Sequence, residues 1–199
     1  QRSPERWGWK LTDLEGRTWG ATQWGVGVEH SAVGTMPDLC SDGWIHYYRD
    51  PVLAVLHDPI QANFGPQARL WSTEVFGPYQ HYGWLKSGCK RARVVLEAPR
   101  PIITTLQRAA YGILAARAVY FEPKWVAWAD RWLRGEDRSS GATYSVRAIT
   151  TAANPAYYAA YYAVCAAAAV AQNAAVDTYD SAAAAYAAYY AAVADAVIL

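Results

Sequence analysis

The chain has 199 residues, a length that suits one domain with an extension or two small domains. Its formal net charge of +1 excludes binding to nucleic acid through bulk charge. The three cysteines, Cys40, Cys89 and Cys165, argue against a disulfide framework and fit a reducing compartment or a virion. The polar first ten residues, which include Pro4 and Arg6, predict no secretory signal peptide.

Residues 1–100 show the alternating pattern of a β-rich domain. Strands are expected over residues 19–30, 69–76 and 91–98, where every second position is suited to one face of a sheet. Gly77-Pro78 is expected to end the second strand. The residues expected to share a face are Thr22, Trp24, Val26 and Val28, then Trp71, Thr73 and Val75, then Ala92, Val94, Leu96 and Ala98.

One short helix is expected inside this β-rich region. Asp50 precedes Pro51, a pair that is typical of an N-cap followed by the first helical residue. Asp58-Pro59 is expected to close the helix. The residues predicted to form its buried face are Val52, Leu53, Val55 and Leu56.

Residues 101–138 are predicted to form a Trp-rich helical segment. Apolar residues at steps of four and three predict a first helix from Ile102 to Tyr120. A second helix is expected from Pro123 to Gly135. One face of this second helix carries Trp125, Trp128 and Trp132. We interpret this row as a core stripe, and the alternative is an exposed platform that stacks on a ligand.

Residues 139–199 form an Ala- and Tyr-rich tail. Alanine is the best helix former, so helices are predicted over 156–176 and 181–198, and their short connection predicts an antiparallel hairpin. Because the hairpin has almost no polar side chains, it needs a covering surface. The tyrosines expected at such an interface are Tyr157, Tyr161, Tyr186 and Tyr190. A membrane span is disfavoured, since the apolar run 156–171 is mainly alanine. The chain is thus predicted to be an α+β protein.

Few residues suggest catalysis. No nucleotide-binding loop, hydrolase elbow or zinc-protease motif occurs in the sequence. Cys40 and His46 are weak candidates for a nucleophile and its base. His57 and Cys89 extend this pair to a set of metal-ligand types, but the spacing matches no compact zinc pattern. We therefore predict no metal site and no cofactor.

The densest basic cluster consists of Lys86, Lys90, Arg91 and Arg93. Trp84, Tyr82 and Tyr79 lie near it in the sequence, and basic residues with aromatic ones can bind phosphate or single-stranded nucleic acid. The interpretation we favour is a solvated edge strand whose charges prevent aggregation.

A pattern within residues 15–140 begins with Cys40, Gly43, Trp44 and His46. A proline-led helix, Glu74-Val75-x-Gly77 and Lys86 follow. This pattern resembles a domain family of unknown function from phages and prophages, which is often followed by Ala-rich regions. The resemblance implies a phage origin but assigns no activity and no role to the motif residues.

These observations predict a phage-associated, non-enzymatic protein that works through contacts with other protein subunits. A capsid-decorating or tail-associated subunit of the virion is one form of this expectation. The predicted location is the virion or the host cytoplasm, and membrane or nucleic-acid partners are disfavoured. The alternatives are a small host-takeover enzyme that uses Cys40 and His46, and a phosphate- or nucleic-acid-binding module that uses the basic cluster.

Overall fold

The computed structural model describes residues 7–83, 86–139, 141–143, 165–167, 169 and 171, with residues 59–61 described by their backbone alone. The chain divides into two compact units, residues 1–102 and 103–199. The first unit holds an antiparallel sheet and one α-helix, and the described elements of the second are helices. The predicted α+β class is therefore confirmed. The predicted boundary after residue 138 lies inside the second unit.

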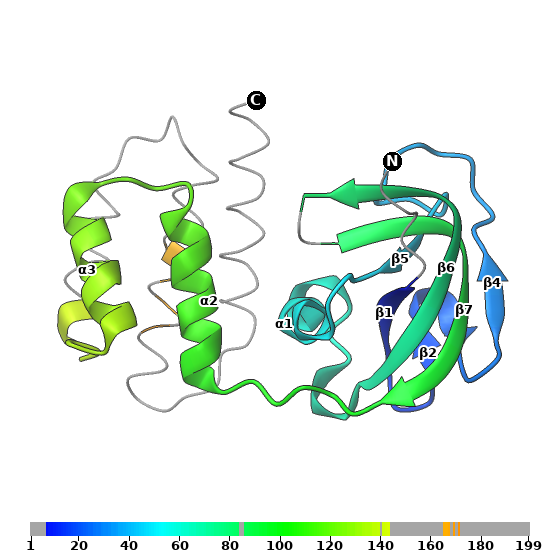
Figure 1. The fold of residues 1–199 in the computed structure, drawn as a ribbon, viewed down its shortest axis with the longest axis horizontal. Coiled ribbons are helices and arrows are strands. Elements are labelled where there is room, and N and C mark those ends of the chain that lie inside the picture. The colour runs from blue at the N-terminus through cyan, green and yellow to red at the C-terminus, as the bar shows by residue number, and fades with distance from the viewer. Residues whose placement is uncertain are drawn as a thin grey trace. The chain divides into compact units, whose positions relative to one another are not determined.

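A five-stranded antiparallel sheet forms the first unit (Figure 1). Its two long central strands, β6 (Arg69–Tyr82) and β7 (Lys86–Ala98), pair with each other. β1 (Trp7–Thr12) pairs with the other edge of β6. β4 (Glu29–Ser31) and β5 (Ile45–Tyr47) pair with successive parts of the remaining edge of β7.

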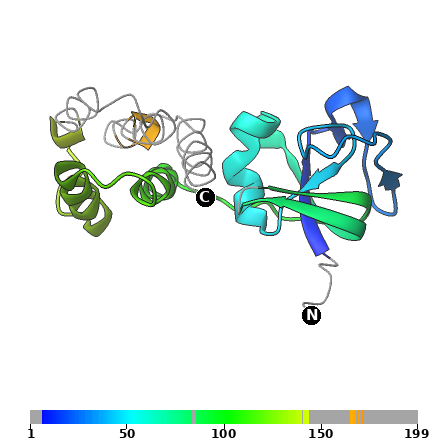
Figure 2. The same cartoon turned by 90° about the horizontal axis from the view of Figure 1, so that it is seen from above.

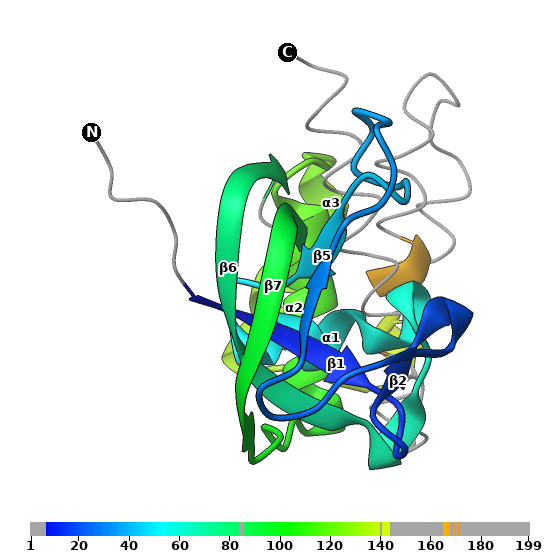
Figure 3. The ribbon, with the colours of Figure 1, turned by 90° about the vertical axis from the view of Figure 1, so that its right-hand side faces the viewer.

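This sheet curves until its two edges meet. Tyr48, directly after β5, exchanges two backbone hydrogen bonds with Trp9 of β1, with N–O distances of 2.7 and 2.8 Å. The curvature of β6 and β7 is visible in Figure 3. A buried cluster of this unit, with three aromatic side chains among its seven residues, consists of Trp24, Tyr47, Trp71, Val75, Cys89, Ala92 and Val94.

The helix α1 (Pro51–Gln61) begins where the sequence predicts. The Asp50 carboxylate accepts a hydrogen bond from the Val52 N–H at 2.7 Å. The predicted end at Asp58-Pro59 is wrong, because the helix runs on to Gln61. The Asp58 carbonyl and carboxylate accept hydrogen bonds from backbone N–H groups of residues 62–65, which stabilises the turn beyond the proline.

α1 lies beside the strands of its own unit (Figure 2) and contacts β1. A second buried cluster joins them and consists of Leu11, Ala54, Ala68 and Leu70. Val55 and Leu56 are buried as predicted, whereas Val52 is 42% exposed, so its predicted burial is wrong.

The single strand predicted over residues 19–30 is also wrong. This segment contains a 3-10 turn at Trp19–Ala21, then β3 (Thr22–Gln23), which pairs with β2 (Arg17–Thr18), and then β4. Gly20 and Ala21 have φ angles of 72° and 58°, in the left-handed region that an extended strand cannot use.

Two bulges change the predicted pattern of β6 and β7. Gly77, with a φ of 77°, and the following proline do not end β6, because the pairing register shifts there and the ladder resumes at Tyr79. A second shift pairs Ser72 with Leu96 but Thr73 with Val94. This shift interrupts the alternation of inward and outward side chains along β7. Leu96, predicted to face inward, is therefore 48% exposed. Trp71, Thr73 and Val75, predicted to share one face, are all buried, and the predicted inward position of Ala92 and Val94 is confirmed.

One buried hydrogen bond links β1 to β6. The Trp71 indole N–H donates to the Thr12 hydroxyl at 2.9 Å, and both side chains are buried. We expect Thr12→Val to lower the free energy of unfolding of this unit by about 1–3 kcal/mol, because the buried indole N–H then lacks an acceptor. Urea unfolding followed by NMR signals of β6 amides measures this change. Thr73→Val is the control with a smaller expected effect, since the Thr73 hydroxyl donates only a long bond of 3.4 Å.

The described part of the second unit begins with α2 (Thr105–Arg117) and α3 (Pro123–Arg134). A capping box between Thr104 and Gln107 sets the start of α2, so the predicted start at Ile102 is wrong, and Ile102 is 94% exposed. α3 starts at Pro123 and its C-cap is Gly135, as predicted. Its tryptophans Trp125, Trp128 and Trp132 are at most 2% exposed, which confirms the core stripe over the exposed platform.

Residues 165–167 are helical, in agreement with the helix predicted over 156–176. The predicted hairpin connection and the predicted interface residues lie outside the described residues. Those interface residues are Tyr157, Tyr161, Tyr186 and Tyr190.

Candidate ligand-binding site

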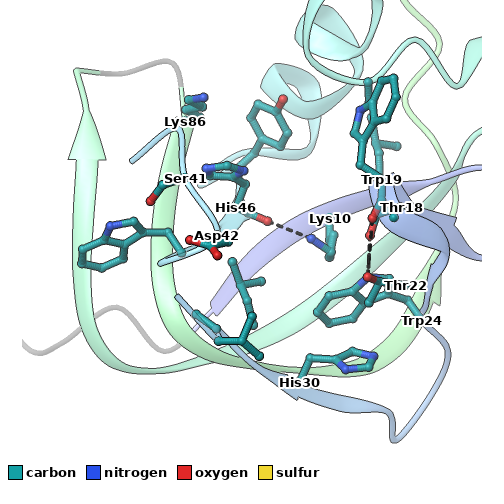
Figure 4. Close-up of a pocket in the computed structure, with 18 of the residues that line it drawn as sticks. Lys10, Thr18, Trp19, Thr22, Trp24, His30, Ser41, Asp42, His46 and Lys86 are labelled. Atoms are coloured by element: carbon teal, nitrogen blue, oxygen red, sulfur yellow. Dashed lines mark hydrogen bonds between the residues drawn. The ribbon is translucent and has the colours of Figure 1, made fainter. Parts of the chain in front are cut away.

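A cavity of about 620 Å³ opens in the first unit, a size within the range of small-molecule sites (Figure 4). Its walls come from β1, the turn before β3, β4, the segment entering β5, and the end of α1 with the chain that follows it. The lining includes three tryptophans, two histidines and two lysines: Trp19, Trp24, Trp44, His30, His46, Lys10 and Lys86.

Lys10 is the most unusual residue in this lining, because its side chain is only 8% exposed. Its ammonium donates a hydrogen bond of 3.0 Å to the His46 carbonyl oxygen and lies 4.4 Å from the ring centroid of Trp24. Burial lowers the pKa of Lys10 to about 8, and the electrostatic interaction with Cys89 opposes this shift. Lys10 therefore carries a substantial fraction of neutral amine at slightly basic pH.

Trp24 provides a fixed aromatic wall next to this amine. Its indole N–H donates to the Thr18 hydroxyl at 3.0 Å, and the side chain is 3% exposed. The His30 ring meets Trp24 edge-on with a centroid distance of 4.6 Å. His30 Nε2 lies 2.8 Å from the Gln23 carbonyl oxygen, so this nitrogen carries a hydrogen and donates. These bonds fix both rings before any ligand enters.

Trp19 contributes a second, more open aromatic surface. It lies in the 3-10 turn that precedes β3, and it is 77% exposed although it lines the cavity. Its open face is therefore available for contact with a ligand ring.

The His46 side chain forms a hydrogen bond to the backbone. Its Nε2 donates to the Leu39 carbonyl oxygen, which leaves Nδ1 as the acceptor of the neutral ring. Burial is the main cause that lowers the pKa of His46, and the charges of Lys86 and Lys10 lower it further. His46 is thus neutral at pH 7.

The weak catalytic candidates do not form a hydrogen-bonded pair. The Cys40 sulfur accepts from Lys86 Nζ at 3.1 Å, whereas the His46 ring bonds to Leu39. Among the described residues, no contact joins the Cys40 thiol to the His46 ring. The arrangement therefore lacks the nucleophile–base hydrogen bond that a cysteine hydrolase requires.

A buried polar group supports the wall formed by the end of α1. The Asp58 carboxylate accepts hydrogen bonds from the Phe64 and Gly65 N–H groups at 3.0 and 3.1 Å.

Burial, with the Asp58 charge, raises the pKa of the Tyr48 hydroxyl, which stays neutral. Burial, with the Lys86 charge, lowers the pKa of the fully buried His57 to about 4.

The predicted basic cluster is divided by the structure. Lys86 lines the cavity and contacts Cys40. Lys90 donates to the Gly43 carbonyl oxygen at 2.6 Å and covers the Trp44 ring. Arg91 pairs with Glu29, and Arg93 pairs with Glu74. The cluster therefore does not present four free positive charges to one phosphate-rich partner, and Trp84 lies outside the described residues.

The sequence did not identify Lys10, Trp19 or Trp24 as cavity residues, although Trp24 was expected on one face of a strand. Lys10 alternates with Trp9 and Leu11 in β1, a pattern that places a lysine on the solvent side of a strand. Trp24 and β5, which come from later parts of the chain, cover that side, so no local signal identifies this amine.

The part of the chain that the structure describes lacks two features. Within it, no group of three His, Cys, Asp or Glu side chains is arranged to hold a metal ion. Likewise, none of its helices combines the length and apolar character that crossing a membrane requires.

Comparison of the chain with protein-family models, curated proteins and solved structures gives no match.

Proposed function

We propose that the first unit binds a small molecule that has a flat ring and an anionic group, and that it does so in the cavity beside Lys10. The observation that carries this proposal is the buried ammonium of Lys10 at the cavity wall, next to the indole of Trp24.

The ammonium argues for a polar or anionic ligand atom. An ammonium has three N–H donors, and the His46 carbonyl is the one hydrogen-bond acceptor that the described residues supply to Lys10. Burying a charge with incomplete hydrogen bonding is costly, and a ligand oxygen at Lys10 offsets this cost. Lys86 adds a second positive charge to the same lining.

The tryptophans argue for a flat ring. Indole faces favour offset or edge-on contact with another aromatic ring. Trp24, fixed by Thr18 and His30, is a rigid wall against which the edge of a ring can pack at little cost in conformational entropy. The exposed Trp19 loses unfavourable contact with water when a ring covers it.

The test is binding of 8-anilinonaphthalene-1-sulfonate, which joins aromatic rings to a sulfonate. We expect saturable fluorescence enhancement with one site on the first unit. Lys10→Met should weaken binding about tenfold, the worth of one charge-assisted hydrogen bond. Trp19→Ala should weaken it by a smaller factor, because Trp19 contributes only one open face.

Two control variants belong to this test. Lys124→Met removes an exposed lysine of α3, and Trp7→Ala removes a 54% exposed tryptophan outside the cavity lining. Both should bind the dye like the wild type. Equal weakening by the cavity variants and the controls would show that the dye reports general surface binding and would remove the proposal.

We also propose, as a second function, that the chain is a non-enzymatic interaction protein of a phage particle. The Cys40–His46 motif pattern and the Ala/Tyr-rich tail support this proposal. Leu106, Leu114 and Phe121 support it too, since they are 45%, 55% and 72% exposed in the second unit. Sedimentation of the full chain should then show self-association or capture by particles, and a strictly monomeric, soluble chain counts against it.

A further inference from the structure

Lys10 differs from an ordinary lysine in both position and surroundings. It lies on β1 opposite Trp71, its side chain is buried, and its Nζ is held between the His46 carbonyl and the Trp24 ring at the wall of the cavity. A binding site that needs only positive charge has no reason to bury it, because an exposed lysine or an arginine supplies that charge at lower cost.

Burial favours loss of a proton from such an ammonium, and the neutral amine that remains is a nucleophile. With a pKa of about 8, roughly a quarter of Lys10 is neutral amine at pH 7.5, against about one part in a thousand for a lysine of ordinary pKa. A desolvated lysine in an apolar pocket is a recurring arrangement for attack on carbonyl compounds.

We propose that the Lys10 amine condenses with an aldehyde or ketone group of the ligand in this cavity and forms an imine. This inference rests on the proposed ligand-binding function and adds the carbonyl group to the chemistry of the ligand. The anionic group of the same ligand then lies toward Lys86, the other amine of the lining.

The reaction balances without any further reagent. The nitrogen lone pair forms a bond to the carbonyl carbon while the carbon–oxygen π bond breaks, and a proton moves from nitrogen to oxygen. The resulting carbinolamine loses its hydroxyl group and one further nitrogen-bound proton as water, which leaves a carbon–nitrogen double bond. Nothing is oxidised or reduced.

The chain contains its own matched comparison. Lys90 Nζ also donates to a backbone carbonyl, that of Gly43 at 2.6 Å, and lies 4.0 Å from the centroid of an indole ring, that of Trp44. Lys90 is half-buried and does not line the cavity. A difference in reactivity between Lys10 and Lys90 therefore reports the cavity and the burial, and not the carbonyl or indole contact.

The experiment uses 4-carboxybenzaldehyde, which joins a ring, a carboxylate and an aldehyde. The full chain is incubated with the aldehyde and sodium cyanoborohydride, which reduces an imine in preference to the free aldehyde, and peptide mass spectrometry locates the reduced adduct among its four lysines, Lys10, Lys86, Lys90 and Lys124. We expect initial labelling of Lys10 at pH 7.5 to exceed that of Lys90 by about tenfold or more, because Lys10 lies at the wall of the cavity that holds the aldehyde and Lys90 does not line it. Labelling of Lys10 should level off above pH 8 to 9.

Two variants and one inert analogue complete the design. Lys10→Arg keeps the positive charge and should lose the adduct at this position, with no gain elsewhere, whereas Lys90→Arg should leave Lys10 labelling unchanged. 4-(Hydroxymethyl)benzoate lacks the carbonyl and should slow labelling by competition. Absence of preferential Lys10 labelling in the wild type overturns the imine, and if the analogue still displaces the naphthalene sulfonate dye, the binding function stands without it.

Discussion

The first unit should become more stable as the pH rises from 8 to about 10, and Lys10→Met should abolish this gain. Lys10 has a pKa of about 8 in the folded chain against an ordinary value of 10.5, so between these values the unfolded chain holds a proton that the folded chain has released. Stability rises with pH wherever the unfolded state binds more protons. The expected gain relative to Lys10→Met is about 3 kcal/mol at most.

The measurement is urea unfolding at several pH values, followed by NMR signals of β6 and β7 amides. Cys89 acts in the opposite direction, because burial raises the pKa of its thiol to about 11 and stability is lost as pH rises through that value. Lys10→Met also removes the Lys10 charge that lowers the Cys89 pKa, so the two proteins are compared mainly below pH 9, where the Cys89 thiol is neutral in both. Lys124→Met should follow the wild type, and parallel curves for wild type and Lys10→Met would contradict the burial of a charged amine.

The second large effect is expected in acid. His57 is fully buried, and burial, together with the nearby charge of Lys86, lowers its pKa from 6.5 to about 4. As the pH falls from 6.5 to 4, His57 binds a proton in the unfolded chain but stays neutral in the folded chain, so the free energy of unfolding decreases in this window. The expected loss is about 3 kcal/mol, and stability above pH 6.5 is unaffected by this group.

His57→Asn removes the titrating group and should flatten the pH dependence between 6.5 and 4, whatever its effect on stability at pH 7. The same NMR-detected unfolding measures it. His81→Leu replaces a half-buried histidine of β6 and should retain the steep acid loss. If His57→Asn lost stability in acid as steeply as the wild type, another group would be responsible.

The sequence predicts those elements that local chemistry determines. The Asp50-Pro51 pair sets the start of α1, and Glu122, Pro123 and Gly135 bound α3. The spacing of three tryptophans correctly identifies a buried face, because helix periodicity alone places them together.

Long-range pairing determines what the sequence does not predict. The ladder with β7 continues past Gly77-Pro78, so a signal that usually ends a strand marks a bulge here. The bulge opposite Ser72 and Thr73 exposes Leu96. The left-handed residues Gly20 and Ala21 divide an apparently continuous strand and bring Trp19 to the cavity.

The candidate site depends even more on the closing of the sheet. Lys10 reaches the His46 carbonyl because the Tyr48–Trp9 bridge joins the two edges of the sheet. Trp24 follows β3 and is held by Gly16 and Thr18. Cys40, His46 and Lys86, which the sequence did single out, lie near or in the same cavity but form different contacts from those expected of a catalytic pair.

The most direct test of the central claim is a titration of the ¹⁵N-labelled full chain with 4-(hydroxymethyl)benzoate, followed by two-dimensional NMR. The ligand-site account predicts saturable shifts of the Trp24 indole N–H and of the backbone amides of Gly20, His30 and Asp42, with α3 unchanged. Shifts that spread evenly over both units, or a cavity whose signals stay fixed at saturating concentrations while other regions respond, would contradict it.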